Sequence, residues 1–596
     1  MMLSAELKTK KRAGVSFPLV SLLSEHSYLC GDFYSLRILK EWAVKTKISL
    51  VQILPLNDLG SGRSPYSSIS AFALDPVYIS FQMLKIPHKK TEFPESGLDI
   101  KKIKKEKLHI LEKYFLSIFD DLLRAELDRF ISSHPFMKIY TCFLLQKDLR
   151  GGTHWEKWNL QYSENLFLES MSKYSEKIYY YVFLQKTAFE QLSRIKQEFK
   201  AAGVYLEGDM PILTSDDSAD VWGRQNLFDR SFHAGAPPDY FNTEGQSWGF
   251  PIIRWEEMKK ENYSWWKERL EYLEHFYHFY RIDHVLGMYR IWAIPKDATS
   301  PKFGHFHPQI GASRKEFNEV RLFPEDFEKL GLIYEHKEDK YIFYWDFFKT
   351  PGYQALDEDI KRRLFPLCEI HLKEDEAKWR RYGEDILSFM MKSSSMLPCA
   401  EDLGAVPKFV RDSIFENEII GLDIIRWTRS FEDGSYIKPA DYRKLAVSCL
   451  SVHDTSTAMG WWKECDPEMK KMLKKVFGLV KEETKSGADI KTEKKAEIEK
   501  EETEEDLSVI NEAMLKFALA AASLFSVHML QDYLYRGKIS KKIHVLTEPE
   551  KHRINVPGTP EDKNWGYVFP FLAEELLSEN ELNSIISEMI SASGRV

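Results

Sequence analysis

Three short apolar runs, far apart in the chain, each lead into an acidic residue and then into a loop. The acids are Asp283, Glu401 and Asp454, and the run before each has the length of a β-strand. A parallel β/α barrel gathers its active-site residues in this way, because the carboxyl ends of its strands all lie at one face. The pattern therefore predicts a barrel in which the three acids lie together.

Eight apolar runs of strand length recur along the chain, separated mostly by stretches with helical spacing. The expected strands are Gly14–Val20, Leu50–Leu56, Val204–Ile212, Phe279–Asp283, Met396–Glu401, Ile419–Trp427, Leu445–Asp454 and Phe525–Leu530. Helical spacing is clear in Phe33–Val44, Ile103–Phe119 and Ile178–Lys200. This alternation is typical of an α/β fold with a parallel sheet. We therefore expect a (β/α)8 TIM barrel with large, mainly helical insertions.

The domain organisation follows from the spacing of these runs. Residues 1–596 are expected to form a single catalytic barrel, with a helical insertion subdomain at 85–200 after the second strand. A second insertion, at 285–395 between strands four and five, is far longer than one crossover helix requires. Residues 478–508 are rich in Lys and Glu with almost no apolar side chains, which predicts a solvated helix or a flexible loop.

Composition excludes several classes of partner. The 596 residues are 43% hydrophobic, which allows a large buried core, and the net charge of -8 comes without a long basic stripe. The chain thus has no electrostatic feature that favours nucleic acid. No apolar run of membrane-spanning length is present, and no apolar segment of a signal peptide follows the basic residues near the N-terminus.

Cysteine usage points to a cytoplasmic protein without a metal centre. The six cysteines are scattered and show no CxxC spacing, so we expect reduced thiols, neither a disulfide framework nor a zinc site. The chain also lacks a Gly-rich phosphate loop and a nicotinamide-binding fingerprint. No cofactor is therefore expected.

The surroundings of the three acids suit glycoside cleavage. A retaining glycosidase needs one carboxylate as nucleophile and a second as acid and then base. Arg281 is expected to keep the neighbouring Asp283 ionised, as a nucleophile must be. The apolar run before Glu401 would raise its pKa and suit a proton donor, and His453 with Asp454 would hold sugar hydroxyls as charge develops. Any one of these acids would fit a loop cap, but three at separate strand ends favour an active site.

Ordered segments over nearly the whole chain resemble the 4-α-glucanotransferases, the amylomaltase and disproportionating-enzyme family of the wider α-amylase group. The segments are Gln52–Leu56, Ser64–Ala73, Gly208–Ile212, Asp216–Trp222, Gly235–Phe241, Gly245–Gly249 and Arg553–Thr559. One segment would be weak evidence, whereas the ordered set is specific. The resemblance implies transfer of α-1,4-linked glucosyl or maltooligosyl units between maltooligosaccharides, glycogen or starch-like glucans. It further implies a covalent glycosyl-enzyme on an Asp, hydrolysis as a side activity, and no metal.

The resemblance also implies roles for single residues. Asp283 would be the nucleophile, Glu401 the acid/base, and Asp454 the third acid, which stabilises the transition state. Substrate-binding roles would fall on Tyr66 at the donor sugar, Trp248 on the acceptor side, Arg281 and His453 at the cleavage point, Asp209 beneath it, and Asn555. Structural alternatives are a core ring for Tyr66, a loop anchor for Trp248 and a turn residue for Asn555, although function concentrates on such loops.

Two features depart from the usual family pattern. Thr455 follows Asp454 where many bacterial members have Asn. The insertion at 285–395 is absent from compact amylomaltases and resembles that of the plant-type cytosolic disproportionating enzymes, which take maltose as donor and a branched glucan as acceptor. We expect this insertion to shape the acceptor site, since barrel loops after strand four lie beside the chemistry.

Two other functions fit parts of the pattern. An α-amylase or α-glucosidase would use the same acids with water as acceptor. The loop 239–248, with its aromatic rings, is expected to cover the site and exclude water, which favours transfer over hydrolysis. A glucan-binding protein without activity would keep the barrel as a scaffold, but the presence of all three acids and Arg281 argues against it.

Overall fold

The chain forms the predicted barrel. The computed structural model describes residues 7–596 except 90–92, 94–96, 240, 241, 405, 431, 481–501, 561 and 562. The barrel strands are β1 (Arg12–Phe17), β2 (Leu50–Ile53), β3 (Tyr205–Pro211), β8 (Phe279–Asp283), β14 (Leu397–Ala400), β15 (Gly421–Ile424), β16 (Ala446–Cys449) and β17 (Phe525–Met529). They form one eight-stranded parallel sheet in the order β14-β8-β3-β2-β1-β17-β16-β15. A bridge between Cys399 and Ile420 joins the two edges of this sheet and closes it.

Each expected strand is present, although several are shorter than the apolar run that predicted them. The largest difference is at β16, which ends at Cys449 although the run was expected to reach Asp454. A turn follows the strand at Val452–Thr455. The Thr455 hydroxyl accepts a hydrogen bond from the Val452 N–H and donates one to the Val452 carbonyl, both at 3.1 Å. Asp454 therefore lies in a loop beyond the strand. Much of the predicted charged insertion 478–508 lies outside the described residues.

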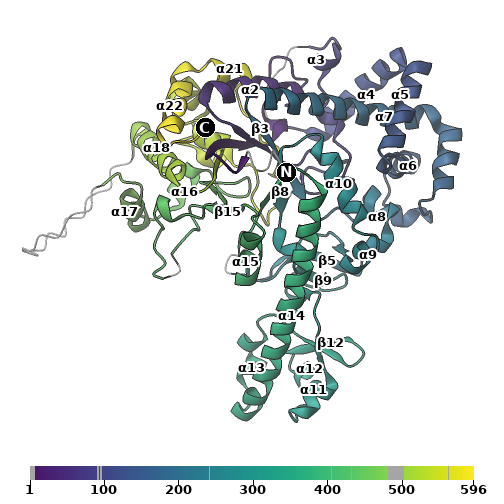
Figure 1. The fold of residues 1–596 in the computed structure, drawn as a ribbon, viewed down its shortest axis with the longest axis vertical. Coiled ribbons are helices and arrows are strands. Elements are labelled where there is room, and N and C mark those ends of the chain that lie inside the picture. The colour runs from purple at the N-terminus through teal and green to yellow at the C-terminus, as the bar shows by residue number, and fades with distance from the viewer. Residues whose placement is uncertain are drawn as a thin grey trace, which may run out of the picture.

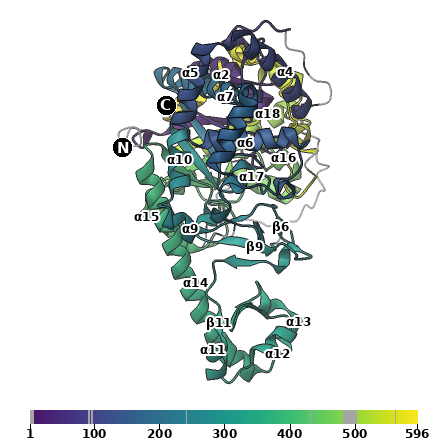
Figure 2. The same ribbon diagram turned by 90° about the vertical axis from the view of Figure 1, so that its right-hand side faces the viewer.

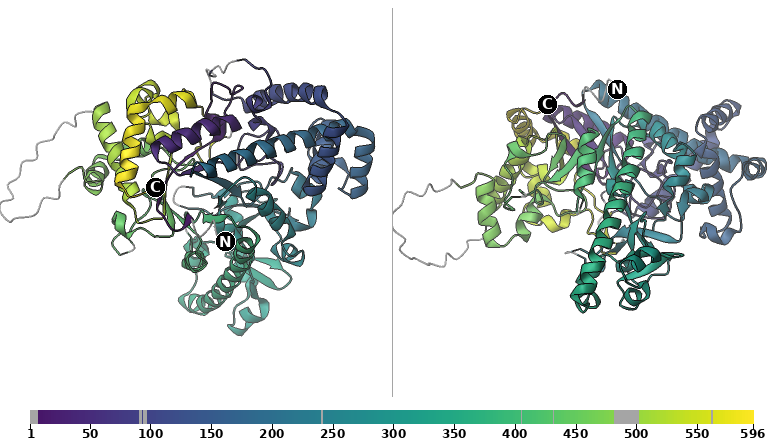
Figure 3. Two further views of the ribbon diagram at one scale, coloured as in Figure 1. Left: turned by 45° about the horizontal axis from the view of Figure 1, so that its top comes forward. Right: turned by 60° about the horizontal axis from the view of Figure 1, so that its bottom comes forward.

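Helices flank the barrel on opposite sides (Figure 1; Figure 3). Between β2 and β3 the chain forms α4 (Ile100–Ile118), α5 (Asp121–Ser133), α6 (Phe136–Leu149) and α7 (Glu164–Ala201). On the opposite flank, α21 (Ala573–Ser578) and α22 (Asn580–Ala592) pack on α2 (Phe33–Thr46). The Trp42 indole of α2 donates to Asn583 of α22 at 2.8 Å, so the last helix is fixed against the first barrel unit.

The segment between β8 and β14 forms a lobe that projects from the barrel (Figure 1; Figure 2). Its first strands, β9 (Ile291–Pro295) and β10 (His305–His307), join β5 (Phe232–Ala236) and β6 (Gln246–Ser247) in a four-stranded sheet. Farther out, a three-stranded sheet packs with short helices against α14 (Glu358–Ser393), which returns to the barrel. The strand order of this sheet is β11 (Ala312–Ser313), β13 (Lys340–Phe343), β12 (Ile333–Lys337). The outer part has its own buried cluster, which includes Ala312, Phe317, Leu322, Phe327, Leu332 and Leu364.

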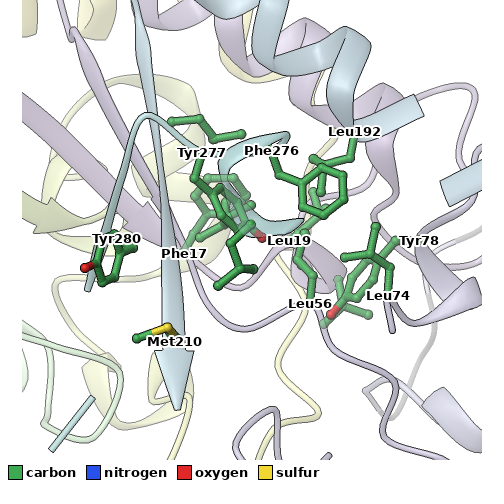
Figure 4. Packing of buried hydrophobic residues seen from close by; sticks show 14 of the residues in the cluster. Phe17, Leu19, Leu56, Leu74, Tyr78, Leu192, Met210, Phe276, Tyr277 and Tyr280 are labelled. Carbon is green, nitrogen blue, oxygen red and sulfur yellow. The ribbon is translucent and has the colours of Figure 1, made fainter. Parts of the chain in front are cut away.

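Apolar side chains fill the barrel below the strand ends that carry the acids. One residue from each of five strands packs in a single buried cluster: Leu50, Tyr205, Phe279, Leu397 and Phe525. A second cluster packs the outside of the strands against the helices, with Phe17, Met210 and Tyr280 on strands and Leu192 on α7 (Figure 4). Burial of each large side chain stabilises the fold by about 1.5–3 kcal/mol.

Candidate active site

Two of the predicted acids lie side by side at the ends of neighbouring strands. Asp283 is the last residue of β8, and Glu401 directly follows β14. The register pairs Ile282 with Ala400, so Asp283 and Glu401 occupy the next position on each chain. The Glu401 N–H donates to the Ile282 carbonyl at 2.9 Å and continues the ladder by one step. Adjacent parallel strands lie about 4.8 Å apart, which places both acids at one end of the barrel.

Arg281 connects Asp283 to a carboxylate beneath it. Its Nη1 lies 2.7 and 2.8 Å from the two oxygens of Asp209 and 2.8 Å from Oδ1 of Asp283. Asp209 is almost completely buried and also accepts a hydrogen bond from the Tyr66 hydroxyl at 2.7 Å. Burial raises the pKa of Asp283 to about 6, although Arg281 acts in the opposite direction. The cation thus keeps a buried carboxyl able to ionise near neutral pH.

Glu401 is held by backbone donors. Its Oε2 accepts from the N–H of His284 at 2.9 Å and its Oε1 from the N–H of Leu403 at 2.9 Å. His284 has a φ of 52°, in the left-handed region, and this turn directs its N–H to the carboxyl. Burial raises the pKa of Glu401 to about 7; Arg281 lowers it and the charge of Asp283 raises it. A carboxyl of this kind retains its proton near neutral pH and suits proton donation.

Asp454 has a different environment. The Asn555 amide donates to its Oδ1 at 2.6 Å, and Nε2 of His453 lies 3.3 Å from its Oδ2. Burial alone would raise the pKa of Asp454, but His453, Asn555 and Arg281 outweigh it and lower the pKa to about 2. Asp454 in turn raises the pKa of the buried His453. This acid is therefore ionised throughout the neutral range.

Aromatic rings link these groups into one site. The Tyr66 ring stacks on His453 with centroids 5.2 Å apart, and the Trp565 ring lies 5.8 Å from both. Trp248 makes an edge contact with His284, whose N–H holds Glu401. These contacts connect all nine residues predicted from the sequence: Tyr66, Asp209, Trp248, Arg281, Asp283, Glu401, His453, Asp454 and Asn555.

Sequence reasoning missed three contributors to this site. Trp565 completes the aromatic cluster, Arg553 donates to the Asp454 carbonyl at 3.2 Å, and His284 orients Glu401. Arg553 begins one of the segments quoted for the resemblance, and His284 directly follows Asp283, so both carried a signal. The expected cover loop 239–248 includes Tyr240 and Phe241, which lie outside the described residues.

A possible metal site elsewhere is already neutralised. Within the described part of the chain, one group of three side chains has ligand atoms close enough for a metal ion: His154, Glu156 and Asp216. Arg230 forms ion pairs with both acids and lies over Trp155. The guanidinium thus supplies the positive charge that a metal ion would bring.

Among the described residues, no helix combines the length and apolar character of a membrane span.

Comparisons with known proteins agree with this geometry. The sequence family described as 4-alpha-glucanotransferase matches residues 17–573. The chain belongs to this family. A 4-alpha-glucanotransferase of Chlamydia trachomatis is 29% identical, over 98% of this chain and 96% of its own length. A 4-alpha-glucanotransferase of rice, Oryza sativa, is 27% identical, over 98% of this chain and 70% of its own.

The fold agrees with a solved structure as well. The amylomaltase of Streptococcus agalactiae, solved in complex with acarbose, superposes with a TM-score of 0.71 at 21% identity. The match covers 98% of this chain and all of that one, and it confirms the predicted TIM barrel. The predicted enzyme class is confirmed too, since members of the 4-alpha-glucanotransferase family are glycosyl-transferring enzymes.

Proposed function

We propose that this enzyme transfers α-1,4-linked glucosyl or maltooligosyl units between glucans with retention, through a glycosyl-enzyme on Asp283. The observation that carries the proposal is the position of Asp283 and Glu401, in register at neighbouring strand ends but in different surroundings. The Arg281 guanidinium contacts Asp283 directly, and the pKa of the buried Glu401 is the higher of the two, about 7 against about 6. Environments that push the pKa values of two acids apart assign one as nucleophile and the other as proton donor.

The proposed reaction has two steps. In the first, an Asp283 oxygen attacks the anomeric carbon while Glu401 protonates the departing glycosidic oxygen, so that one C–O bond forms and another breaks. In the second, an acceptor hydroxyl gives its proton to Glu401 and attacks the same carbon, which releases Asp283. Two inversions give net retention. Water in place of the acceptor would give hydrolysis, which we propose as the side activity.

The remaining residues are proposed to bind sugar. Asp454, ionised and held by Asn555, is placed to stabilise positive charge on the sugar ring in the transition state. Tyr66, stacked on His453, would present its ring to the donor sugar, and Arg281 with Asp209 would fix the centre of the site. Trp248, beside His284, would line the acceptor side.

We also propose that the segment 285–395 shapes the acceptor site, as an insertion within one catalytic domain. The support is the four-stranded sheet in which β9 of this segment pairs with β5, next to β6. Trp248 directly follows β6, so the insertion and the acceptor-side ring share one sheet. A glycogen-like acceptor with maltose as donor would fit such an extended surface.

We propose a cytoplasmic location, since all six cysteines are free thiols.

The first experiment is incubation of the purified protein with maltotriose, followed by separation of the products by length. Glucose together with chains longer than the substrate would establish transfer. Shorter sugars alone would indicate a hydrolase, and no products, even with maltose and glycogen together, would indicate a binding protein. Deletion of the lobe residues should change acceptor choice, and an unchanged acceptor preference would contradict the role of the insertion.

The covalent step needs its own test. Glu401→Gln with α-maltosyl fluoride should form the glycosyl-enzyme and release it slowly, since no base activates the acceptor. Mass spectrometry of the peptides should then find a maltosyl group on the peptide that contains Asp283. Asp454→Asn is the matched control, because it removes a carboxylate of the same site without removing the acid/base. A label on any other peptide would refute the assignment of Asp283.

A further inference from the structure

The barrel closes between β14 and β15, directly beside Glu401. These strands meet at one isolated bridge, between Cys399 and Ile420, whereas each pairs with its other neighbour over four residues. The bridge has two backbone hydrogen bonds: the Ala400 N–H donates to Ile420 at 2.6 Å, and the Ile420 N–H donates to Pro398 at 3.4 Å. The backbone ladder therefore holds this seam over a shorter length than it holds the strands on either side.

Three charged side chains span the same seam. Nη1 of Arg443 donates to Asp402 at 2.7 Å, while its Nε and Nη2 donate to Asp423 at 3.1 and 2.8 Å. The Asp402 side chain is fully buried and also accepts from the Leu422 N–H of β15 at 2.7 Å. Gly421 permits the approach, because a Cβ there would lie 2.6 Å from the guanidinium. The planar fork of Arg donates from separate nitrogens to each carboxylate in a fixed geometry, which the single Nζ of Lys does not reproduce.

This cluster reaches Glu401 through the backbone. Asp402 follows Glu401, and the next N–H, that of Leu403, donates to the Glu401 carboxyl at 2.9 Å. Fixing the Asp402 side chain therefore fixes the peptide that binds the acid. The cluster also acts on Glu401 through charge. The negative charge of Asp402 adds to the rise in the pKa of Glu401, of which burial is the main cause. Arg443 balances that charge at hydrogen-bonding distance.

We propose that Arg443 is a positioning residue for Glu401 and acts through Asp402. The inference rests on the proposed role of Glu401 as acid/base. Arg443→Met would leave Asp402 and Asp423 without their cation and would release the peptide at Leu403. Because a displacement of about 1 Å at a catalytic group costs about 100-fold in rate, we expect a loss of about 10- to 100-fold in kcat on maltotriose. KM should change much less, and Arg443→Lys should restore part of the activity.

The test compares two donors that differ in their need for a proton. Departure of a sugar from maltotriose needs the acid, whereas departure of fluoride from α-maltosyl fluoride needs it far less. We expect Arg443→Met to lower maltotriose transfer strongly and the initial burst of fluoride only slightly. An equal loss with both donors would show a merely structural effect and overturn the proposal. Arg429→Met is the control, since Arg429 binds backbone carbonyls and the Tyr436 ring instead of these acids.

Two further variants keep the outcomes separable. Thermal unfolding shows whether each variant is folded. If Arg443→Met does not fold, Asp423→Asn takes its place, because it weakens the cluster and keeps the Asp402–Arg443 pair. It should then show a smaller loss with the same dependence on donor. Glu401→Gln is measured in parallel. If Glu401→Gln loses activity equally with both donors, the assignment of Glu401 as acid/base fails. If Glu401→Gln shows the donor dependence and the cluster variants do not, only the role of Arg443 fails.

Discussion

The pH dependence of transfer follows directly from the surroundings of the two neighbouring acids. The pKa of Asp283 is raised to about 6 and that of Glu401 to about 7, in both cases mainly by burial. If Asp283 must be ionised and Glu401 protonated, kcat/KM rises as the pH passes the first value and falls as it passes the second. The competent form then peaks at about 60% of the enzyme near pH ~6.5 and falls to about 10% at about pH 5 and about pH 8.

The assay is the initial rate of glucose release at maltotriose concentrations well below KM, at constant ionic strength. A bell with both limbs inside about pH 5–8 supports the reasoning, because acids with unshifted pKa values would place both limbs near about pH 4. Glu207 is another buried acid, and burial raises its pKa to about 8, so its ionisation would affect the alkaline side of the profile. Glu207→Gln separates the two, since a falling limb that belongs to Glu401 remains in this variant.

One result would refute the reasoning about Glu401. Glu401→Gln, measured through its residual rate on maltotriose, should lose the falling limb, because its amide does not titrate. A limb that persists there near the same pH would belong to another group. A rate that falls continuously from about pH 5 to about pH 8 in the wild type, with no rising limb, would show that burial does not shift the two acids as proposed.

Three further perturbations test separate parts of the site. Asn555→Ala removes the 2.6 Å hydrogen bond to Asp454 and should lower kcat/KM about 10-fold. This is the low end for a hydrogen bond to a charged group, because the Asp454 side chain is partly exposed. Arg281→Met leaves the buried Asp209 unpaired and should lower the unfolding free energy in urea by about 3–5 kcal/mol; an unchanged midpoint would contradict this. The pKa of Glu207 is about 8 in the folded chain and 4.5 in the unfolded chain. The folded state therefore has the full benefit of the protonated Glu207 below pH 4.5 and loses it as the pH rises through about 8. Glu207→Gln should therefore gain stability over the wild type as the pH rises, which urea midpoints at about pH 5 and pH 8 will measure.

The barrel and its acids could be predicted because their signals are local. Each barrel strand is a short apolar run, and Asp283 and Glu401 stand at the ends of two such runs. The rule that strand ends of a parallel barrel share one face then brings them together without any knowledge of contacts. Asp454 was predicted from the same pattern, but β16 ends at Cys449, so the residue lies in a loop whose turn is closed by Thr455.

The parts that could not be predicted depend on contacts between distant residues. Arg443 lies 41 positions from Asp402, and neither residue has a neighbour that marks it as one of a pair. The strands of the lobe were missed for a different reason. Elements as short as β10 (His305–His307) or β11 (Ala312–Ser313) have too few residues to show alternation, so periodicity cannot separate them from loops.

Three carboxyl groups of the same chemistry acquire different protonation states from what surrounds them. Asp454 accepts an amide hydrogen bond beside His453 and is ionised at any neutral pH, so it cannot donate a proton to a leaving sugar. Glu401 is the only one of the three acids whose pKa is raised to about 7, and it therefore still holds a proton where Asp283 is already ionised. The proposed division of roles thus depends on burial and on Arg281 as much as on the acids. A change at the Arg443 cluster would reach the reaction through the position of Glu401, because Asp402 precedes the Leu403 N–H that binds the Glu401 carboxyl.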